Sequence, residues 1–258
     1  GGNIGRPLIE YVDEIQPDDR VILELSSFQL EQMTISPSVA AVLNITPNHL
    51  DRHGTLEAYA AAKAHILTYQ NAVNTAVLNR EDAGSWNLIE RVRGKLVSFG
   101  LQAPEAGQTG TFRGKDKLFL QTPEGQVELM PQSEILLRGE HNVANVLAAC
   151  AIAWSASIPL DALRAGVSGF TGVAHRLEFV RELNGARWYN DSIATAPERT
   201  MAALRSFTEP LVLLLGGRDK KLPWEDLAEM IHERVDHVVL FGEALPEGAI
   251  AEAVAESR

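Results

Sequence analysis

Apolar residues in the first half of the chain gather into short continuous runs, and amphipathic stretches lie between them. Four runs have the length of strands: residues 21–25, 39–45, 75–78 and 96–99. Such runs are typical of strands that are buried on both faces of a parallel sheet. Three intervening stretches favour helices: residues 27–33, 56–69 and 86–92. Thr55 is the expected N-cap of the second helix. The alternation predicts a doubly wound α/β domain.

The pattern changes after residue 100. Residues 101–138 are rich in Gly, Gln, Thr and Pro and hold short alternating runs, so we expect a small antiparallel insertion there. Two further helices are expected at residues 142–154 and 160–165. Residues 166–172 are expected to form a linker.

A second unit is predicted from residue 174 onward. Asn184-Gly185 lies between two short alternating runs, and this dipeptide is a strong signal for a two-residue hairpin turn. A helix, a buried strand, a second helix and another strand follow at residues 197–207, 211–215, 224–234 and 237–241. This order predicts a Rossmann-like fold. We therefore predict two domains, at residues 1–172 and 173–258.

The composition adds limits on partners and setting. The 258 residues carry 34 acidic and 23 basic side chains, so the formal net charge at pH 7 is -11. This surplus of carboxylates disfavours contact with nucleic acid and with anionic membranes. The longest apolar stretch, residues 146–154, is shorter than the roughly 18 residues of a membrane span. The single Cys150 can form no intramolecular disulfide, and its apolar neighbours predict a buried thiol. We expect a cytoplasmic protein without a membrane span and without a nucleic-acid partner.

A carboxylate and an imidazole follow two of the predicted strands. Glu24 lies near the end of the run 21–25, and His49 follows the run 39–45. If these strands are neighbours, both side chains enter one crevice at the carboxyl edge of the sheet, where a metal ion could bind. An exposed glutamate and a structural histidine are the alternatives.

Lys63 occupies an unexpected position on its predicted helix. It lies on the apolar stripe, four residues after Tyr59 and four before Leu67. A lysine on such a face either extends its ammonium to water or has a buried function, and the first is the commoner outcome.

Other polar side chains lie near predicted helix starts and turns. Asn142 and Asn145 share a helix face because they are three residues apart, although Asn142 could simply be the N-cap. Arg176, Asp191 and Thr195 lie around the predicted hairpin and the next helix entrance, where Asp191 could be only a turn residue. The turn at residues 216–221 offers N–H groups and cations, which suit a carboxylate or phosphate, and a solvated charged turn is the alternative.

Several segments recur in the same order in one known family. They are residues 1–5 (Gly-Gly-Asn-Ile-Gly), 24–31 (Glu-Leu-Ser-Ser-Phe-Gln-Leu-Glu), 44–52, 61–63, 139–145, 175–178 and 190–192. The chain resembles the Mur ligases across nearly its whole length. The resemblance implies a ligase that acts in peptidoglycan precursor synthesis. In that reaction ATP phosphorylates the carboxylate of UDP-N-acetylmuramoyl-L-alanine, and the amine of D-glutamate attacks the acyl phosphate.

The resemblance also implies roles for individual residues. Glu24, His49 and Lys63 match magnesium ligands, with two Mg²⁺ ions expected and Lys63 carbamylated by CO₂. Lys63 and His49 are the expected catalytic residues. The other expected contacts are Asn3 and Ser26 with the muramoyl-alanine substrate, Asn142, Asn145, Arg176 and Asp191 with ATP, and Thr195 and Lys220 with the incoming glutamate.

Two features depart from the family pattern. The family has a lysine where this chain has Ile193, which removes one expected cation near the phosphates. The chain also lacks the phosphate loop Gly-x-x-x-x-Gly-Lys-[Ser/Thr]. We therefore expect a fragment of a monomeric enzyme, inactive by itself, without the N-terminal domain, the phosphate loop and the C-terminal end. A Mur-type ligase with another amino-acid acceptor and a non-catalytic nucleotide-binding module stay as alternatives.

Overall fold

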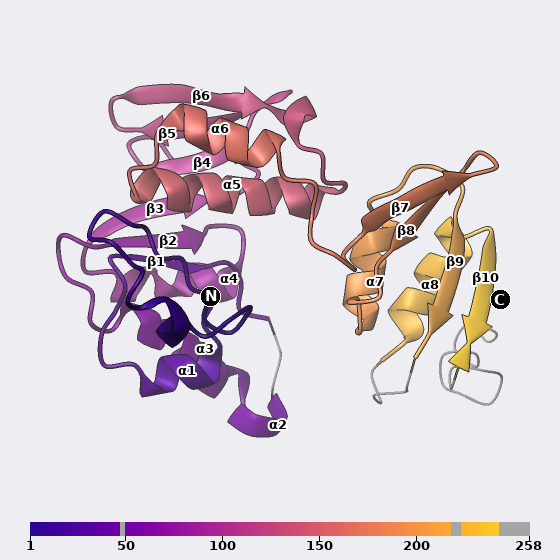
Figure 1. Ribbon diagram of the computed structural model, residues 1–258, viewed down its shortest axis with the longest axis horizontal. Helices are drawn as coiled ribbons and strands as arrows, with labels where there is room; N and C mark the ends of the chain where they lie inside the picture. Colours follow the sequence, from indigo (N-terminus) through magenta and orange to yellow (C-terminus); the bar gives the residue numbers. More distant parts are fainter. Residues whose placement is uncertain (47–49, 218–222, 243–258) are drawn as a thin grey trace. The chain divides into compact units, whose positions relative to one another are not determined.

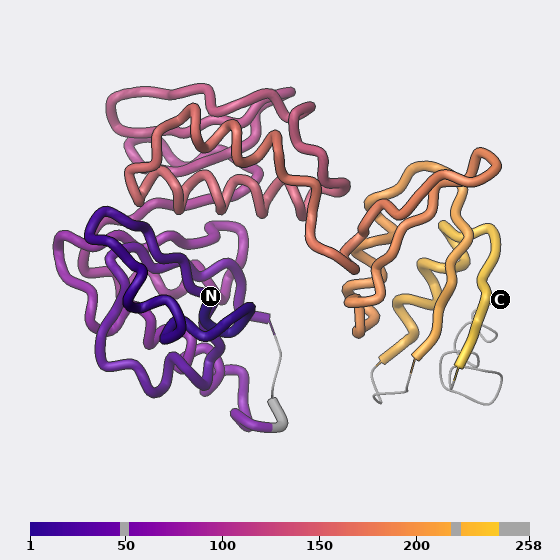
Figure 2. The backbone as a smooth tube through the Cα atoms, viewed as in Figure 1, coloured from indigo at the N-terminus to yellow at the C-terminus, as the bar shows by residue number. Residues whose placement is uncertain are grey.

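The computed structural model describes residues 1–46, 50–217 and 223–242 (Figures 1 and 2). His49 and Lys220 lie outside the described residues. Contacts divide the chain into two compact units: unit 1 is Gly1–Glu134 with Ala144–Ser168, and unit 2 is Ile135–Val143 with Gly169–Arg258. The domain boundary predicted at residue 172 stays a prediction.

Unit 1 is built on a six-stranded sheet whose strands lie in chain order. The strands are β1 (Val39–Val42), β2 (Thr75–Asn79), β3 (Lys95–Phe99), β4 (Gly110–Arg113), β5 (Lys117–Thr122) and β6 (Gly125–Pro131). The pairs from β1 to β4 are parallel, and the pairs from β4 to β6 are antiparallel. Three of the four predicted parallel strands are thus confirmed. The antiparallel segment is confirmed too, but it extends the central sheet and is not a separate insertion.

Helices and 3₁₀ turns precede, connect and follow these strands (Figure 1). They are η1 (Leu8–Tyr11), α1 (Ser27–Gln32), α2 (Leu50–His53), α3 (Leu56–Ala64), η2 (His65–Leu67), α4 (Ala83–Trp86), η3 (Asn87–Arg91), η4 (Gln132–Glu134), α5 (Glu140–Ser155) and α6 (Leu160–Ser168). Thr55 caps α3 as predicted, because its side chain accepts a hydrogen bond from the Ala58 N–H at 3.1 Å.

One core of unit 1 lies between the sheet and the helices α1 and α3. Its buried side chains include Leu30, Val42, Tyr59, Leu67 and Leu78. These residues come from both strands and helices, so burial of their apolar surface holds the two layers together.

Residues 21–25 do not form the predicted strand. They make only an isolated parallel bridge, between Gly2 and Glu24. Val21, Ile22 and Leu23 are exposed. The prediction is wrong because an apolar run becomes a central strand only when other strands pair with both of its edges. Among the described residues, only Gly1 and Asn3 form backbone hydrogen bonds with this run.

Several helix boundaries differ from the predictions. α3 ends at Ala64 and is followed by η2, and the helix expected at residues 197–207 ends at Leu204. α5 begins at Glu140, so Asn142 lies inside the helix and is not its N-cap. α6 continues to Ser168, into the expected linker. The side chain of Ser168 bonds to the Arg164 carbonyl at 3.0 Å and to Glu134 Oε2 at 2.8 Å, which satisfies polar groups at this helix end. The stretch 86–92 is mainly the 3₁₀ helix η3.

Unit 2 begins with the predicted hairpin. β7 (Glu178–Leu183) and β8 (Ala186–Asn190) are antiparallel. Asn184 and Gly185 connect them with φ angles of 52° and 81°, both in the left-handed region. A type I′ turn needs this conformation at both central residues, and Asn-Gly accepts it at low cost. The dipeptide therefore determines the turn locally, as predicted.

The rest of unit 2 has the predicted Rossmann-like order. Its elements are α7 (Pro197–Leu204), β9 (Val212–Gly216), α8 (Glu225–Arg234) and β10 (His237–Phe241). β9 and β10 pair in parallel. Leu204, Leu227 and Ile231 form the buried centre of the core that joins the helices to this sheet.

The buried thiol of α5 allows a chemical test of the fold. Cys150 has no exposed surface, and burial raises the pKa of its thiol to about 12. A raised pKa keeps an acid neutral at lower pH, and only the thiolate reacts rapidly with alkylating reagents. We therefore expect iodoacetamide at about pH 8 to leave Cys150 unmodified in the folded protein and to modify it in urea, as measured by mass spectrometry. Modification of the folded protein as fast as that of free glutathione would contradict this packing.

Candidate functional site

Asn3 and Glu24 lie in contact at the surface of unit 1. The Asn3 side-chain amide donates to Glu24 Oε1 at 3.2 Å, and the Asn3 N–H donates to the Glu24 carbonyl at 2.7 Å. Gly2 makes this approach feasible, because a Cβ at that position would lie 2.1 Å from the Glu24 carbonyl oxygen. The structure thus brings a predicted substrate contact beside a predicted metal ligand, although Glu24 does not end a central strand.

Ser26 begins α1, two residues after Glu24. Its backbone N–H and its hydroxyl both donate to Gln29 Oε1, at 2.9 and 3.0 Å, and its oxygen accepts from the Gln29 N–H at 3.3 Å. This is a capping box in which the residue at the third helical position is Gln. The cap fixes the position of the Ser26 hydroxyl relative to Glu24 and gives Ser26 a structural role that the sequence analysis did not assign.

Lys63 lies on α3 and is half-buried. Its Nζ lies 5.2 Å from the ring centroid of Tyr59, which is buried. An ammonium over the face of an aromatic ring is attracted by the ring's electron density. The Lys63 side chain is therefore not simply extended into water. Its cation–π contact with Tyr59 differs from both arrangements predicted from the sequence.

The backbone that leads toward His49 is fixed by the turn after β2. Asp82 Oδ1 accepts from the Ile45 N–H at 3.0 Å and from the Ser85 N–H at 2.7 Å. Ser85 Oγ donates to the Val42 carbonyl at 2.7 Å, and the Asn79 side chain donates to the Leu43 carbonyl at 3.0 Å. Three polar side chains of one turn thus hold the end of β1 and the residues after it.

Gly84 belongs to the same arrangement. A Cβ on Gly84 would lie 2.7 Å from both the Cβ and the carbonyl oxygen of Ile45, so only glycine allows the two segments to touch. The sequence analysis missed these residues. The available signal was an aspartate just before a short helix, since Asp is a preferred N-cap.

A three-ligand metal site is not formed by the described residues alone. Among them, the structure has no group of three or more His, Cys, Asp or Glu side chains that could hold a metal ion. His49 falls outside this search, and Lys63 would become a ligand only as a carbamate. The predicted convergence of Glu24, His49 and Lys63 on one ion therefore stays a prediction.

A charged cluster gathers in unit 2 around Asp191. Asp191 is half-buried, and its Oδ1 accepts from the Leu177 N–H at 3.0 Å. Burial raises the pKa of the Asp191 carboxyl, while the N–H of Leu177 and the charges of Arg176, His141 and Arg199 lower it. Burial lowers the pKa of the neighbouring His141, while the negative charge of Asp191 raises it. Arg176 and Asp191, two of the predicted ATP contacts, thus lie near His141 in the first turn of α5.

The backbone around Arg176 is unusual. His175 and Leu177, on either side of it, have φ angles of 66° and 44°. Left-handed conformations are unfavourable for such residues and tend to occur where a site holds its backbone in one geometry. The side chain of Asn190 lies 2.8 Å from His175 Nδ1, and the His175 N–H donates to Glu178 Oε2 at 2.8 Å. These bonds hold Arg176 at the end of the hairpin.

The remaining predicted contacts are placed as follows. Asn142 is buried, and Asn145 lies three residues further along α5 with an exposed side chain. Thr195 is exposed before α7, whose N-cap is Ala196 and whose first residue is Pro197. Ile193, the departure from the family pattern, is also exposed.

Comparison with known families identifies the class of protein. Residues 10–153 match the Mur ligase middle domain, and residues 175–257 match the domain described as "Mur ligase, glutamate ligase domain". The chain belongs to the Mur ligase family. The predicted resemblance is therefore confirmed.

Curated relatives narrow the comparison within this family. The UDP-N-acetylmuramoylalanine–D-glutamate ligase of Clostridium kluyveri is 44% identical over 243 residues, which cover 94% of this chain and 51% of the relative. The corresponding ligase of Symbiobacterium thermophilum is 42% identical over 254 residues, which cover 98% and 55%. The chain thus spans about half the length of the curated relatives it matches.

Solved structures confirm the α/β fold. A UDP-N-acetylmuramoylalanyl-D-glutamyl-2,6-diaminopimelate–D-alanyl-D-alanyl ligase from Acinetobacter baumannii has a TM-score of 0.66 at 25% identity, covering 86% of this chain and 48% of that one. The UDP-N-acetylmuramate-alanine ligase MurC from Thermotoga maritima has a TM-score of 0.64 at 17% identity, covering 91% and 53%. Within the described residues, no helix is both long and apolar enough to cross a membrane.

The Asp82 turn gives a test of the structure at the site. Asp82→Ala should lower the free energy of unfolding by about 1–3 kcal/mol, because the Ile45 and Ser85 N–H groups lose their acceptor. Asp82→Asn keeps an acceptor oxygen and should cost less. The measurement is urea unfolding followed by circular dichroism. Asp161→Ala is the control, since that side chain is 97% exposed. Equal losses in Asp82→Ala and Asp161→Ala would exclude the role described.

Proposed function

We propose that this chain is the middle and C-terminal part of an ATP-dependent ligase that adds D-glutamate to UDP-N-acetylmuramoyl-L-alanine, a step of peptidoglycan precursor synthesis in the cytoplasm. The observation that carries the proposal is the 40–44% identity to ligases of that name over nearly the whole chain. The other Mur-type neighbours, which have other substrates in their names, are more distant in sequence.

The chemistry of the proposed reaction explains why ATP is needed. A carboxylate is a poor electrophile, so the γ-phosphoryl group of ATP is first transferred to the carboxylate of UDP-N-acetylmuramoyl-L-alanine, which releases ADP. The amine of D-glutamate then attacks the carbonyl carbon of the acyl phosphate. The tetrahedral intermediate releases phosphate, the nitrogen loses its proton, and an amide remains. The protein mainly positions the reactants and neutralises phosphate charge.

The nucleotide contacts are proposed in two groups. Asn142 and Asn145 share one face of α5 and would contact the base. Arg176 and Asp191 would contact the rest of the nucleotide. The cluster of Arg176, His141 and Asp191 supports this part of the proposal, because it combines a guanidinium suited to phosphate oxygens with a partly buried acceptor suited to hydroxyl groups.

Glu24, His49 and a carbamylated Lys63 are proposed to hold Mg²⁺, with two ions expected. Oxygen donors suit this ion, and the Glu24 carboxylate is exposed and accepts a hydrogen bond from Asn3 at Oε1. The Lys63 ammonium over Tyr59 does not suit Mg²⁺, whereas a carbamate there would be an anion. Bound Mg²⁺ would neutralise charge on the phosphates. The carbamate would be unfavourable over the ring without a nearby cation, so ion and modification are expected together.

The substrate contacts complete the assignment. Asn3 and Ser26 are proposed to face the muramoyl-alanine substrate. Their proximity to Glu24, a proposed metal ligand, supports this assignment. Thr195 and Lys220 are proposed to bind the two carboxylates of D-glutamate. Ile193 supplies no cation, so the phosphates would depend more on Mg²⁺ and Arg176. We propose a monomeric enzyme.

A phosphate-release assay tests the proposed function in the full-length protein that contains this chain. We expect release only when ATP, UDP-N-acetylmuramoyl-L-alanine and D-glutamate are all present. Replacing D-glutamate with L-glutamate or lysine separates the alternative of another acceptor. Release with one of these and none with D-glutamate would contradict the proposed acceptor. Failure to bind ATP with Mg²⁺ in calorimetry would exclude both a ligase and a nucleotide-binding module.

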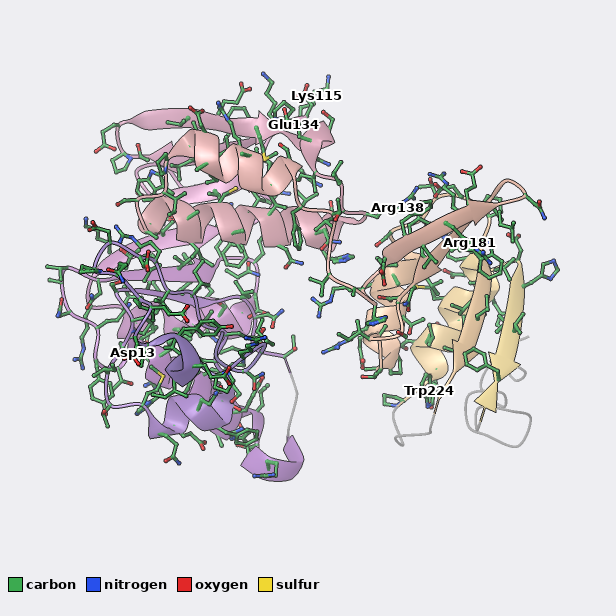
Figure 3. The ribbon with its side chains drawn as sticks, viewed as in Figure 1. Asp13, Lys115, Glu134, Arg138, Arg181 and Trp224 are labelled. Carbon is green, nitrogen blue, oxygen red and sulfur yellow. The ribbon has the colours of Figure 1, made fainter. Side chains whose placement is uncertain are left out.

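Lys63 provides a test within the chain. Lys63→Ala in the full-length protein should lower kcat at least about 100-fold, because the carbamate ligand is lost. Short carboxylates such as acetate should restore part of the activity by supplying an anionic oxygen. The control is Lys115→Ala, which removes an exposed lysine (Figure 3). Unchanged activity in Lys63→Ala would leave Lys63 with only its packing against Tyr59.

A further inference from the structure

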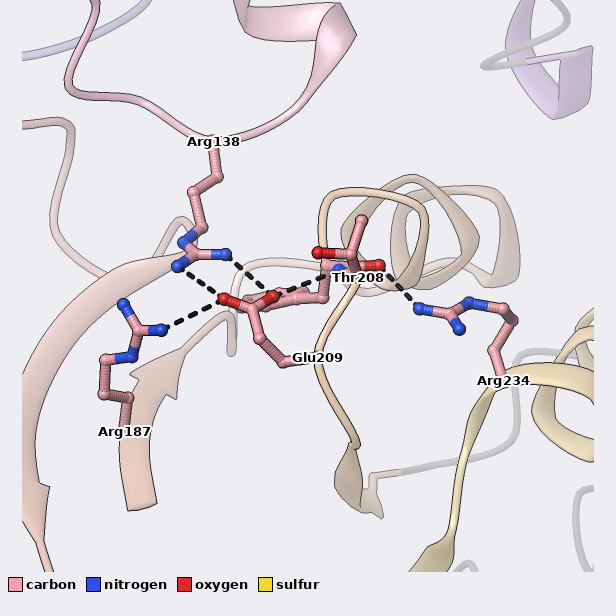
Figure 4. Close-up of polar contacts among 6 residues, drawn as sticks. Arg138, Arg187, Thr208, Glu209 and Arg234 are labelled. Carbon is pink, nitrogen blue, oxygen red and sulfur yellow. Dashed lines mark hydrogen bonds and ion pairs between the residues drawn. The ribbon is translucent and has the colours of Figure 1, made fainter. Parts of the chain in front are cut away.

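One arginine binds the turn before α5 to a segment that follows α7, and both lie within unit 2. Arg138 donates from its two terminal nitrogens to Glu209, at 3.2 and 3.0 Å (Figure 4). Its guanidinium also lies 5.4 Å from the ring centroid of Tyr189 and 5.0 Å from that of Phe207. A planar guanidinium can make all of these contacts at once, whereas a lysine ammonium cannot.

Glu209 is held in place by several donors. Arg187 donates to Oε1 at 3.1 Å, and the Thr208 N–H donates to Oε2 at 3.0 Å (Figure 4). The hydrogen bond from Arg138 is the main reason why the pKa of the Glu209 carboxyl falls to about 2. The segment is anchored further because Arg234 of α8 donates to the Phe207 carbonyl at 2.6 Å. Arg138 therefore binds a fixed, ionised partner at neutral pH.

The backbone of Arg138 acts on a predicted nucleotide contact. Its carbonyl accepts from Asn142 Nδ2 at 2.7 Å, and the Gly139 carbonyl accepts from the Asn142 N–H at 3.0 Å. Gly139 has a φ of 91°, and a Cβ there would lie 2.3 Å from Ser206 Oγ, so the turn lies directly against the segment after α7. One residue thus binds Glu209 through its side chain and orients the Asn142 amide through its carbonyl.

We propose that Arg138 is a positioning residue for the nucleotide site: its pair with Glu209 fixes the turn that orients the Asn142 amide. The inference rests on the proposed function, since it takes Asn142 to be a nucleotide contact. An ion pair that is partly open to water contributes little to overall stability. The Arg138 side chain is 28% exposed and that of Glu209 is 37% exposed. The main consequence of the pair is therefore the geometry of the turn.

Calorimetry of ADP with Mg²⁺ tests the inference in the full-length protein. Arg138→Gln and Glu209→Gln should each raise the Kd for ADP about fivefold, and the double variant should bind no more weakly than either single one. Glu128→Gln is the matched control, because it breaks another surface ion pair, with Lys117 at 2.8 Å. That control should leave the Kd unchanged. In the phosphate-release assay, KM for ATP should rise while KM for D-glutamate stays constant.

The outcomes separate this inference from the function on which it rests. If the unaltered protein binds no ADP or ATP, the proposed function fails and the inference fails with it. If the unaltered protein binds ADP and both variants bind equally tightly but unfold at lower temperature, the pair is only structural and the inference alone is overturned. If Arg138→Gln fails to fold, Arg138→Lys is the second variant, because it keeps the charge but loses the bidentate hydrogen bond to Glu209. An unchanged Kd for ADP in Arg138→Lys would also overturn the inference.

Discussion

The parallel pairing of β2 with both of its neighbours decides where the segments that follow β1 and β2 meet. Ala76 lies opposite Ala40 of β1 and Leu96 of β3, and no surface of Ala76, Val77 or Leu78 is exposed. Parallel strands run in one direction, so the chain leaves each of them at the same edge of the sheet. The segments after β1 and after β2 therefore meet there and bind each other.

Hydrogen bonds from side chains to the backbone then fix these connecting segments. Peptide groups outside a sheet or helix need partners when water is excluded, and polar side chains of a neighbouring turn can supply them. Asp82 does this for Ile45, which follows β1, and Ser85 does it for Val42, the last residue of β1. In unit 2 the side chain of Asn142 donates to the carbonyl of Arg138, as the side chain of Ser85 donates to the carbonyl of Val42 in unit 1. In both places, hydrogen bonds between side chains and backbone fix an irregular segment that lies next to a predicted ligand-binding residue.

The distribution of charge fits a protein whose proposed substrates are anionic although the chain itself is acidic. A net charge of -11 would repel nucleotides on average, so cations must be concentrated locally. Among the described residues, two cations lie at the proposed site positions: Arg176, which is next to Asp191, and Lys63, which lies over the Tyr59 ring. With Ile193 at the position where the family has lysine, the proposed Mg²⁺ ions have a larger share of the phosphate charge to neutralise.

The sequence by itself determined the features that depend on neighbouring residues: the strands β1, β2 and β3, the Thr55 cap and the Asn184-Gly185 turn. Its ordered motifs also determined the family. Only the tertiary structure decided that residues 21–25 form an isolated bridge in place of a strand, and that Lys63 faces Tyr59. It also decided that Arg138 binds Glu209, 71 positions away. The physical reason is that cap, turn and strand preferences act over a few residues, whereas strand pairing and side-chain contacts depend on which distant segments the topology brings together.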